Sequence, residues 1–285
     1  MSHTRRLAGA VIAALVLGAG VIGAVHLSRA EAMPLRDPAP MQALMPPPSA
    51  GVITPSTILS EPKDDGRVMV PDQPVGVRYT FDGGVDKPIL DAHGGRELRA
   101  VAQNGGRLSL VPQGLGLAVE YPDRCTMPRE RDCPRAILEG DRDDTLNPGT
   151  RPLEYGASVL MTHADLADGA NVVQKGYSVG GVSQFKLQVD HRQGHPSCVI
   201  ASRSRIYRAE PSLDVADGTW HQLTCARSRE RLAIIVDGAE RAAVPVPANL
   251  SIANAEPLRI GGKGANRGND QFAGRIDNVF LTISA

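Results

Sequence analysis

After Val75 the chain consists of short runs in which apolar and polar residues alternate, separated by clusters of Gly, Asp, Asn and Pro. A period of two residues is typical of half-buried β-strands, and no long apolar stripe with the 3.6-residue period of a helix occurs. The pattern predicts strands within 77–81, 107–111, 116–121, 157–161, 185–189 and 222–226. Because no helices separate these strands, the sequence indicates one all-β domain, a sandwich of two antiparallel sheets.

The clearest pair of strands lies within residues 231–244. An apolar run from Arg231 to Val236 is followed by Asp237 and Gly238, and then by a second run. Asp-Gly is typical of a two-residue type I′ turn, because both residues tolerate its positive φ angles. This stretch is therefore predicted to form a β-hairpin.

Six short motifs connect this strand-rich region to a known family. They are Phe81-Asp82-Gly83-Gly84, Gln174-Lys175-Gly176, Asp217-Gly218-Thr219-Trp220-His221, Val236-Asp237-Gly238, Ile260-Gly261-Gly262 and Phe272-Ala273-Gly274-Arg275-Ile276-Asp277-Asn278-Val279. In this order they resemble laminin G-like domains of the concanavalin A-like lectin/glucanase superfamily. The resemblance covers about residues 75–285 and is strongest after Asn171. It implies a two-sheet antiparallel jelly roll and a function in binding, but no single ligand, because ligands vary widely within the family.

The first 32 residues have the composition of an export signal. Arg5 and Arg6 precede an uncharged run from Ala8 to Val25, and Ala30-Glu31-Ala32 provides the small-x-small pattern of a signal peptidase site. We therefore expect cleavage before Met33 and secretion. The uncharged run is also just long enough to span a bilayer, so a retained membrane anchor that holds the protein at the cell surface is the alternative.

Frequent Pro residues characterise the next stretch, residues 33–75. Proline interrupts helices and central strands, and Pro-rich segments act as semi-rigid spacers. We interpret residues 33–75 as a disordered linker that carries the folded domain, residues 76–285.

Composition narrows the classes of partner. The chain has 31 basic and 31 acidic residues, so no positive excess is available for nucleic-acid binding. One Trp, five Tyr and four Phe are few for a protein that stacks sugars on aromatic rings. Tyr155, Tyr177 and Tyr207 are candidates for exposed rings, whereas Trp220 is expected to fill the core.

Four cysteines follow the export signal, so two disulfides are expected in an oxidising compartment. Sequence alone allows three pairings. We expect Cys125–Cys133, which closes a short loop, and Cys198–Cys225, which joins two strands. A zinc site formed by His191, His195 and Cys198 is the rival interpretation, although these residues lie around a turn and not on one helix face.

One acidic segment offers a catalytic alternative. Glycosidases of this fold carry carboxylates on one face of a strand, and the nearest match here consists of Glu139, Asp141 and Asp144. The apolar alternation of a half-buried strand is missing around them, so an acidic turn is the favoured interpretation.

A metal site follows from the resemblance alone. In related jelly rolls a calcium ion at the rim is held by the first and last strands, and the matching positions are Asp82 and Asp277. The Gly83 carbonyl and Asn278 are further oxygen ligands for such an ion. The same carboxylates also suit turns, and the ligand count does not distinguish the two roles. A structural calcium is thus optional, and no other cofactor is expected.

The sequence as a whole favours an exported, non-catalytic recognition or adhesion module that binds a glycan or a protein at the cell surface. A glycan-cleaving enzyme and a purely structural envelope domain are the alternatives. The sequence does not identify the ligand or its binding residues.

Overall fold

The computed structural model describes residues 50–53, 68–84, 88–166, 169–178, 182–190, 193–202 and 205–285. The expected signal or anchor, residues 1–32, and most of the expected linker lie outside these ranges. None of the helices in the described ranges is long and apolar enough to cross a membrane.

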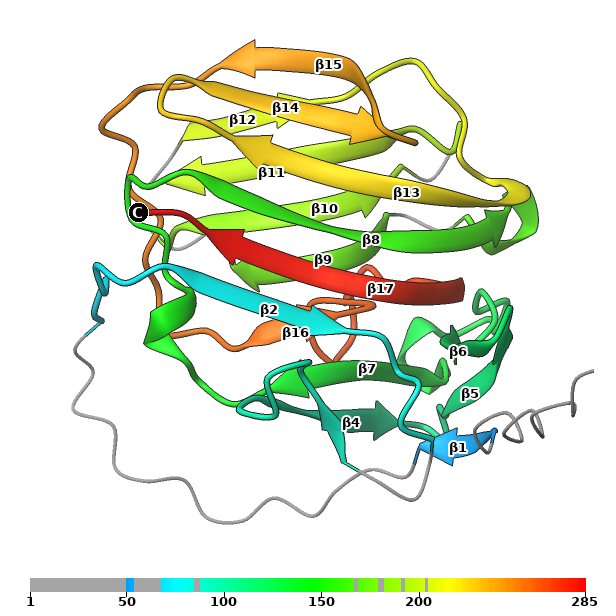
Figure 1. Ribbon diagram of the computed structural model, residues 1–285. Helices are drawn as coiled ribbons and strands as arrows, with labels where there is room; N and C mark the ends of the chain where they lie inside the picture. Colours follow the sequence, from blue (N-terminus) through cyan, green and yellow to red (C-terminus); the bar gives the residue numbers. More distant parts are fainter. Residues whose placement is uncertain are drawn as a thin grey trace, which may run out of the picture. The chain divides into compact units, whose positions relative to one another are not determined.

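The described strands form two antiparallel sheets that stack as a sandwich (Figure 1), as the sequence predicts. One sheet has nine strands in the order β1 (Gly51–Ile53), β5 (Leu108–Gln113), β6 (Gly116–Tyr121), β17 (Gly274–Ile283), β8 (Leu153–Thr162), β13 (Asp217–Arg227), β14 (Arg231–Val236) and β15 (Ala239–Pro245), with β2 (Val75–Tyr79) also paired to β17. The other has eight strands in the order β12 (Arg205–Ala209), β11 (Pro196–Ser202), β10 (Gln184–Val189), β9 (Ala170–Gly176), β16 (Leu258–Ile260), β7 (Arg135–Gly140), β4 (Glu97–Gln103) and β3 (Ile89–Leu90).

The predicted hairpin is confirmed as β14 and β15. Asp237 and Gly238 join these strands with φ angles of 52° and 76°, as a type I′ turn requires. The Asp237 carboxylate also accepts the backbone N–H of Gln222, at 2.8 Å, and so ties the turn to β13.

The core lies between the two sheets, where the inward-facing side chains of each strand meet. Tyr155 of the nine-stranded sheet packs against Phe185 of the eight-stranded sheet with ring centroids 4.9 Å apart. Its hydroxyl donates to the carbonyls of Lys186 and Val199, which lie on β10 and β11. A fully buried tyrosine thus connects the two layers, and the expectation that Tyr155 is exposed is wrong.

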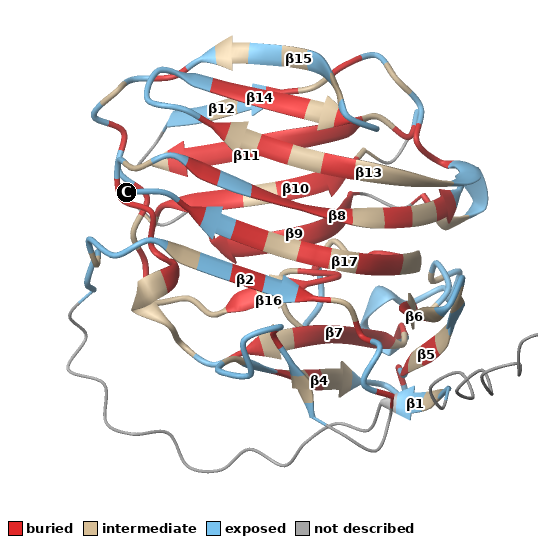
Figure 2. Cartoon of the chain, viewed as in Figure 1, coloured by how far each residue is buried: buried red, intermediate tan, exposed pale blue. Residues whose placement is uncertain are grey.

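Burial differs between the centre and the edges of the sandwich (Figure 2). Along β9, β10 and β11 nearly every residue is buried on both faces of the sheet. By contrast, β12 and β15 are mostly exposed. They are the last strands of their sheets and contact each other at one side of the sandwich.

Two stretches within the expected linker contact the sandwich. Gly51–Ile53 pairs with Leu108–Leu110 as an edge strand. The backbone of Met69 donates to Asp144 at 2.8 Å and accepts from Asn147 at 2.9 Å. For these stretches the interpretation as a free tether is wrong. The extended backbone between the prolines can pair with the unpaired N–H and C=O groups at the edge of the sheet.

Candidate functional site

A pocket of about 420 Å³ lies at the exposed side of the sandwich. One wall comes from the end of β11 and from β12, with Ser202, Arg205 and Tyr207. The other comes from the segment after β15, and is formed by Pro247, Asn249, Leu250 and Ser251. Ligand pockets in proteins are commonly about 300–1,000 Å³, so this one suits a small ligand or the end of a larger one.

Local β-structure places the polar side chains of this pocket. Side chains alternate across a strand, so Arg205 and Tyr207 lie on one face of β12 while Ile206 and Arg208 lie on the other. Arg205 and Tyr207 therefore line the same wall of the pocket. Tyr207 is partly buried and packs against the core, which fixes its ring.

The polar groups of the pocket lack partners within the part of the chain that the structure describes. Among the described residues, none forms a hydrogen bond or ion pair with the side chains of Ser202, Arg205, Tyr207, Asn249 or Ser251. None of the described residues that line the pocket carries a carboxylate, and Arg205 brings a positive charge to it. A guanidinium offers five N–H donors in a planar fork that suits carboxylate and sulfate groups.

Two buried cations position the segment that forms the second wall. Arg227 reaches from β13 and donates to the carbonyls of Leu250, at 2.6 Å, and Gly149, at 2.9 Å. Lys175 points inward from β9, and its ammonium donates to the carbonyls of Asn254, at 3.0 Å, and Glu256, at 2.7 Å. These bonds satisfy backbone oxygens that a buried loop would otherwise leave unpaired.

Burial changes the acid–base behaviour of both cations. Removal from water lowers the pKa of Lys175 to about 8, against the opposing charges of Asp144 and Asp143. Burial likewise lowers the pKa of Arg227. Their fixed carbonyl partners make them positioning residues for the pocket and not ligand-binding residues, because neither lines it.

The candidate catalytic carboxylates are not brought together. Glu139 lies on the outer face of β7 and forms an ion pair with Arg259 at 2.6 Å, and Asp141 pairs with Arg99. Asp144 lies in a short 3₁₀ helix, where it accepts bonds from Arg142 and from the backbone N–H of Met69. Although burial opposes it, these bonds lower the pKa of Asp144. Each carboxylate is neutralised by its own arginine, which is not the arrangement of a general acid with an opposing carboxylate.

The two carboxylates expected to hold calcium lie near each other. Burial, together with the charge of Asp82, raises the pKa of Asp277 to about 6. Asp277 accepts bonds from the backbone and side chain of Asn278, and Asp82 accepts the N–H of Leu117 at 2.8 Å. The side-chain oxygen Oδ1 of Asn278, a further expected ligand, accepts a hydrogen bond from Arg78 at 3.0 Å.

Both expected disulfides are confirmed. Cys125–Cys133 closes a short loop, and Cys198–Cys225 links β11 to β13 and therefore joins the two sheets. The rival zinc site of His191, His195 and Cys198 is wrong, because Cys198 is disulfide-bonded and faces the core. His191 lies outside the described residues.

The comparison with known proteins agrees with this architecture. Residues 157–282 match the model of a family described as the concanavalin A-like lectin/glucanases superfamily. This match covers the later part of the sandwich and agrees with the resemblance that its motifs indicate. A comparison with curated proteins finds no match.

Solved structures share the fold at low sequence identity. The binding domain of Paraclostridial Mosquitocidal Protein 1 has a TM-score of 0.55 and 14% identity, over 74% of this chain and 49% of that one. Domain 4 of AbnA, an extracellular arabinanase from Geobacillus stearothermophilus solved with arabinotriose, has a TM-score of 0.53 and 14% identity, over 73% of this chain and 92% of that one. The binding domain of botulinum neurotoxin DC with rat synaptotagmin II has a TM-score of 0.54 and 10% identity, over 74% and 48%. This chain thus spans about half the length of the toxin domains.

Proposed function

We propose that this protein is an exported, non-catalytic recognition module that binds a glycan bearing an acidic group in the pocket between β12 and the segment after β15. The observation that carries the proposal is the set of polar side chains around this pocket that have no partner among the described residues, with one arginine and one tyrosine among them. On the outer face of the eight-stranded sheet, by contrast, Glu139, Asp141 and their arginines already bind one another. A ligand there would first have to break those ion pairs.

Each pocket residue has a role that follows from its chemistry. The Arg205 guanidinium binds the acidic group of the sugar, and the Tyr207 ring provides an apolar surface for a sugar face. The Asn249 amide and the hydroxyls of Ser202 and Ser251 supply donors and acceptors for sugar hydroxyls. One aromatic ring is enough for a single sugar unit, which fits the low aromatic content of the chain.

Proteins of the same fold give the proposal its setting. The arabinanase domain is solved with arabinotriose, and botulinum neurotoxin DC with SialylT. The same toxin domain is also solved with synaptotagmin II, so a protein partner is the second possibility to test. Adhesion at a cell surface, through a tether or an anchor, is part of the proposal and rests on the sequence of residues 1–75.

An array of neutral and acidic glycans, followed by calorimetry on the best ligand, tests this function. We expect binding to an acidic glycan, weakened by salt because the arginine contact is electrostatic. Arg205→Ala should lower the affinity at least about tenfold, since a hydrogen bond to a charged group contributes about 1.5–3 kcal/mol. Tyr207→Ala should lower it as well.

Arg208→Ala is the matched control, because Arg208 is an arginine of the same strand on the opposite face. It should bind the glycan as the unaltered protein does. Binding that Arg208→Ala and Arg205→Ala weaken equally would place the site elsewhere. If the protein binds no glycan but captures a defined envelope protein, the partner is a protein. If it binds neither a glycan nor a protein, a purely structural domain is favoured.

A further inference from the structure

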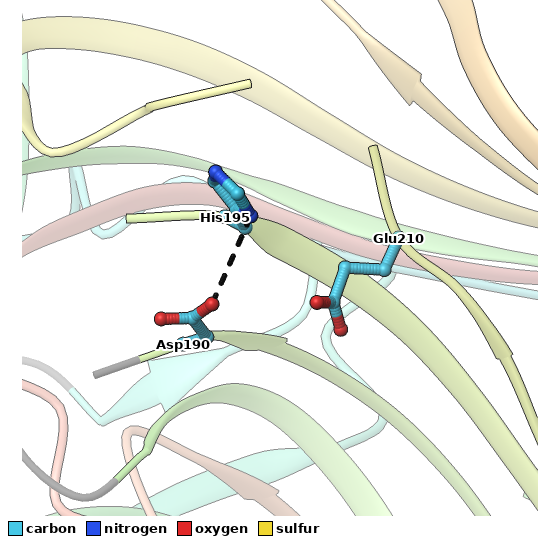
Figure 3. A group of neighbouring side chains, drawn as sticks. All are labelled: Asp190, His195 and Glu210. Atoms are coloured by element: carbon cyan, nitrogen blue, oxygen red, sulfur yellow. Dashed lines mark ion pairs between the residues drawn. The ribbon is translucent and has the colours of Figure 1, made fainter. Parts of the chain in front are cut away.

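Three potential metal ligands meet at one end of the eight-stranded sheet, away from the pocket (Figure 3). Asp190 follows β10, His195 precedes β11 and Glu210 follows β12. One ligand atom from each lies within 4.8 Å of the other two. Their side chains are 22%, 18% and 29% exposed, so an ion from solution can reach them.

The register of the sheet explains why these residues meet. Val189 pairs with Pro196, and the next residues along, Asp190 and His195, are joined by a backbone bond of 2.8 Å from the Asp190 N–H to the His195 carbonyl. Cys198 pairs with Ala209, so the next residues, Ser197 and Glu210, lie opposite each other. All four residues alternate with core positions and therefore lie on the outer face of the sheet.

The residues that directly precede His195 are held in place before any ion binds. The backbone N–H of Gln193 donates to Asp190 at 3.1 Å. The Gly194 carbonyl accepts the N–H of Val215, and a Cβ at Gly194 would lie 2.2 Å from the Asp214 carboxylate. With φ at +67°, this position requires glycine. Gly194 is thus fixed against the segment that leads from β12 to β13.

A second observation points to a ligand at this place. The Ser197 side chain is fully buried on the outer face, next to Glu210, and its hydroxyl has no hydrogen-bond partner within the described residues. A buried hydroxyl without a partner costs free energy. A water bound to a metal ion above it, or a carboxylate drawn toward that ion, would satisfy it.

We propose that Asp190, His195 and Glu210 bind a divalent transition-metal ion of the zinc class, with a water as the fourth ligand and Ser197 beneath it. Imidazole nitrogen favours zinc over calcium or magnesium, which prefer oxygen ligands. The His195 Nδ1 and Asp190 Oδ2 atoms are 3.9 Å apart. A tetrahedral ion with ligands at about 2.0–2.1 Å would draw them together by roughly half an ångström.

Metal binding at this position would have a mechanical consequence. It would attach the turn between β10 and β11 to the end of edge strand β12, the same strand that carries Arg205 and Tyr207. Glu210 also forms an ion pair with Arg208 at 3.1 Å. Both side chains are exposed enough for the ion to displace this pair at little cost.

Zinc titration of the chelator-treated full chain, by calorimetry and thermal melting, tests the proposal. We expect one zinc ion per chain at this site and a melting temperature that rises with zinc concentration. His195→Ala and Glu210→Gln should each weaken this binding at least about tenfold, since even outer-shell partners of metal ligands commonly contribute about 10–100-fold. X-ray absorption at the zinc edge should detect one imidazole and otherwise oxygen ligands.

His163→Ala is the matched control, because His163 is paired with Asp214 at 2.6 Å but belongs to no group of three ligands among the described residues. It should bind zinc as the unaltered chain does. Melting without zinc verifies that each variant is folded, and Glu210→Gln keeps the shape of the side chain. No zinc binding, binding that survives both ligand variants, or equal binding of calcium would overturn the proposal.

Discussion

Lys175 is a buried lysine on the inner side of a β-sheet, where an apolar residue is the usual choice. Its place in the strand pairs it with Phe185 and Leu258, and both of these face the core. The ammonium is retained because it binds three oxygen atoms of the segment that contains Asn254 and Glu256. A lysine in a core thus holds the stretch that follows the pocket wall, and its burial has a measurable consequence.

The free energy of unfolding should rise with pH through the titration of Lys175. Its pKa is about 8 in the native state and 10.5 when exposed. Below about pH 8 the amine is protonated in both states and the cost of burying its charge is fully present. Between about pH 8 and 10.5 the unfolded state holds the extra proton, so stability increases with pH, by up to about 3 kcal/mol over the whole window.

Denaturant titrations of the unaltered chain and of Lys175→Met between pH 7 and 9.5 measure this effect. The difference between the two proteins removes the contribution of other groups. We expect the Lys175→Met variant to lack the rise that is due to this residue. Equal slopes for the two proteins would contradict a depressed pKa at Lys175.

The expected calcium site depends on two residues, Asp82 and Asp277. Asp82 and Asp277 supply two carboxylates that repel each other, and an ion between them would remove that repulsion. Calcium should therefore raise the melting temperature of the unaltered chain, and Asp277→Asn should lose this gain. If melting is the same in calcium and in chelator, these residues only shape their turns.

At the scale of strands and loops, the two disulfides constrain very different parts of the chain. Cys198–Cys225 spans 27 residues and joins the two sheets inside the core, whereas Cys125–Cys133 spans 8 residues at the surface. In the loop-entropy account, stabilisation grows with the logarithm of the loop length. The inter-sheet disulfide should thus contribute about 1 kcal/mol more.

Thermal melts of the two double Cys→Ser variants test this order. We expect the larger fall in melting temperature for the Cys198/Cys225 variant. Its two serine hydroxyls would also be placed in the core, so melts of Cys198→Ala/Cys225→Ala separate that cost from the loss of the disulfide. An equal or larger fall for the Cys125/Cys133 variant would contradict the order.

Strands were predictable from sequence, but the sites were not. A period of two residues identifies a strand by itself, and Asp237-Gly238 identifies its turn. Register does not follow from that period, so nothing in the sequence indicates that Glu210 lies beside His195. The pocket likewise brings Arg205 close to Asn249, although the two are far apart in the sequence. The sequence pointed to one wall of the pocket only, through the expectation that Tyr207 is an exposed ring.

Trp220 shows how a local pattern can mislead. A single Trp in an alternating strand suits a sandwich core, yet this residue is only partly buried. The pairing of β13 with β8 shifts between Asp217 and Trp220, while Leu223 and Cys225 face the core. Trp220 therefore lies on the outer face with Gln222 and Thr224, because even-numbered positions of this strand point outward.

The molecule as a whole combines a sandwich with a disulfide through its centre, and this bears on where it folds. Among the described residues no cysteine is free, and Cys198 and Cys225 are fully buried. A disulfide of this kind forms during folding in an oxidising compartment. The two disulfides thus agree with the export that the first 32 residues suggest.

We accordingly predict that the mature protein begins at Met33. Arg5 and Arg6, the uncharged run after them and Ala30-Glu31-Ala32 have the order of a cleaved signal, and two disulfides are typical of proteins that fold outside the reducing cytosol. N-terminal sequencing of the protein from its own host measures this directly. An exported chain that keeps residues 1–32 would favour the membrane anchor, and an uncleaved cytosolic chain with reduced cysteines would contradict export. A matched variant, Ala30→Leu with Ala32→Leu, should leave the signal uncleaved, because the peptidase accepts only small residues at these positions.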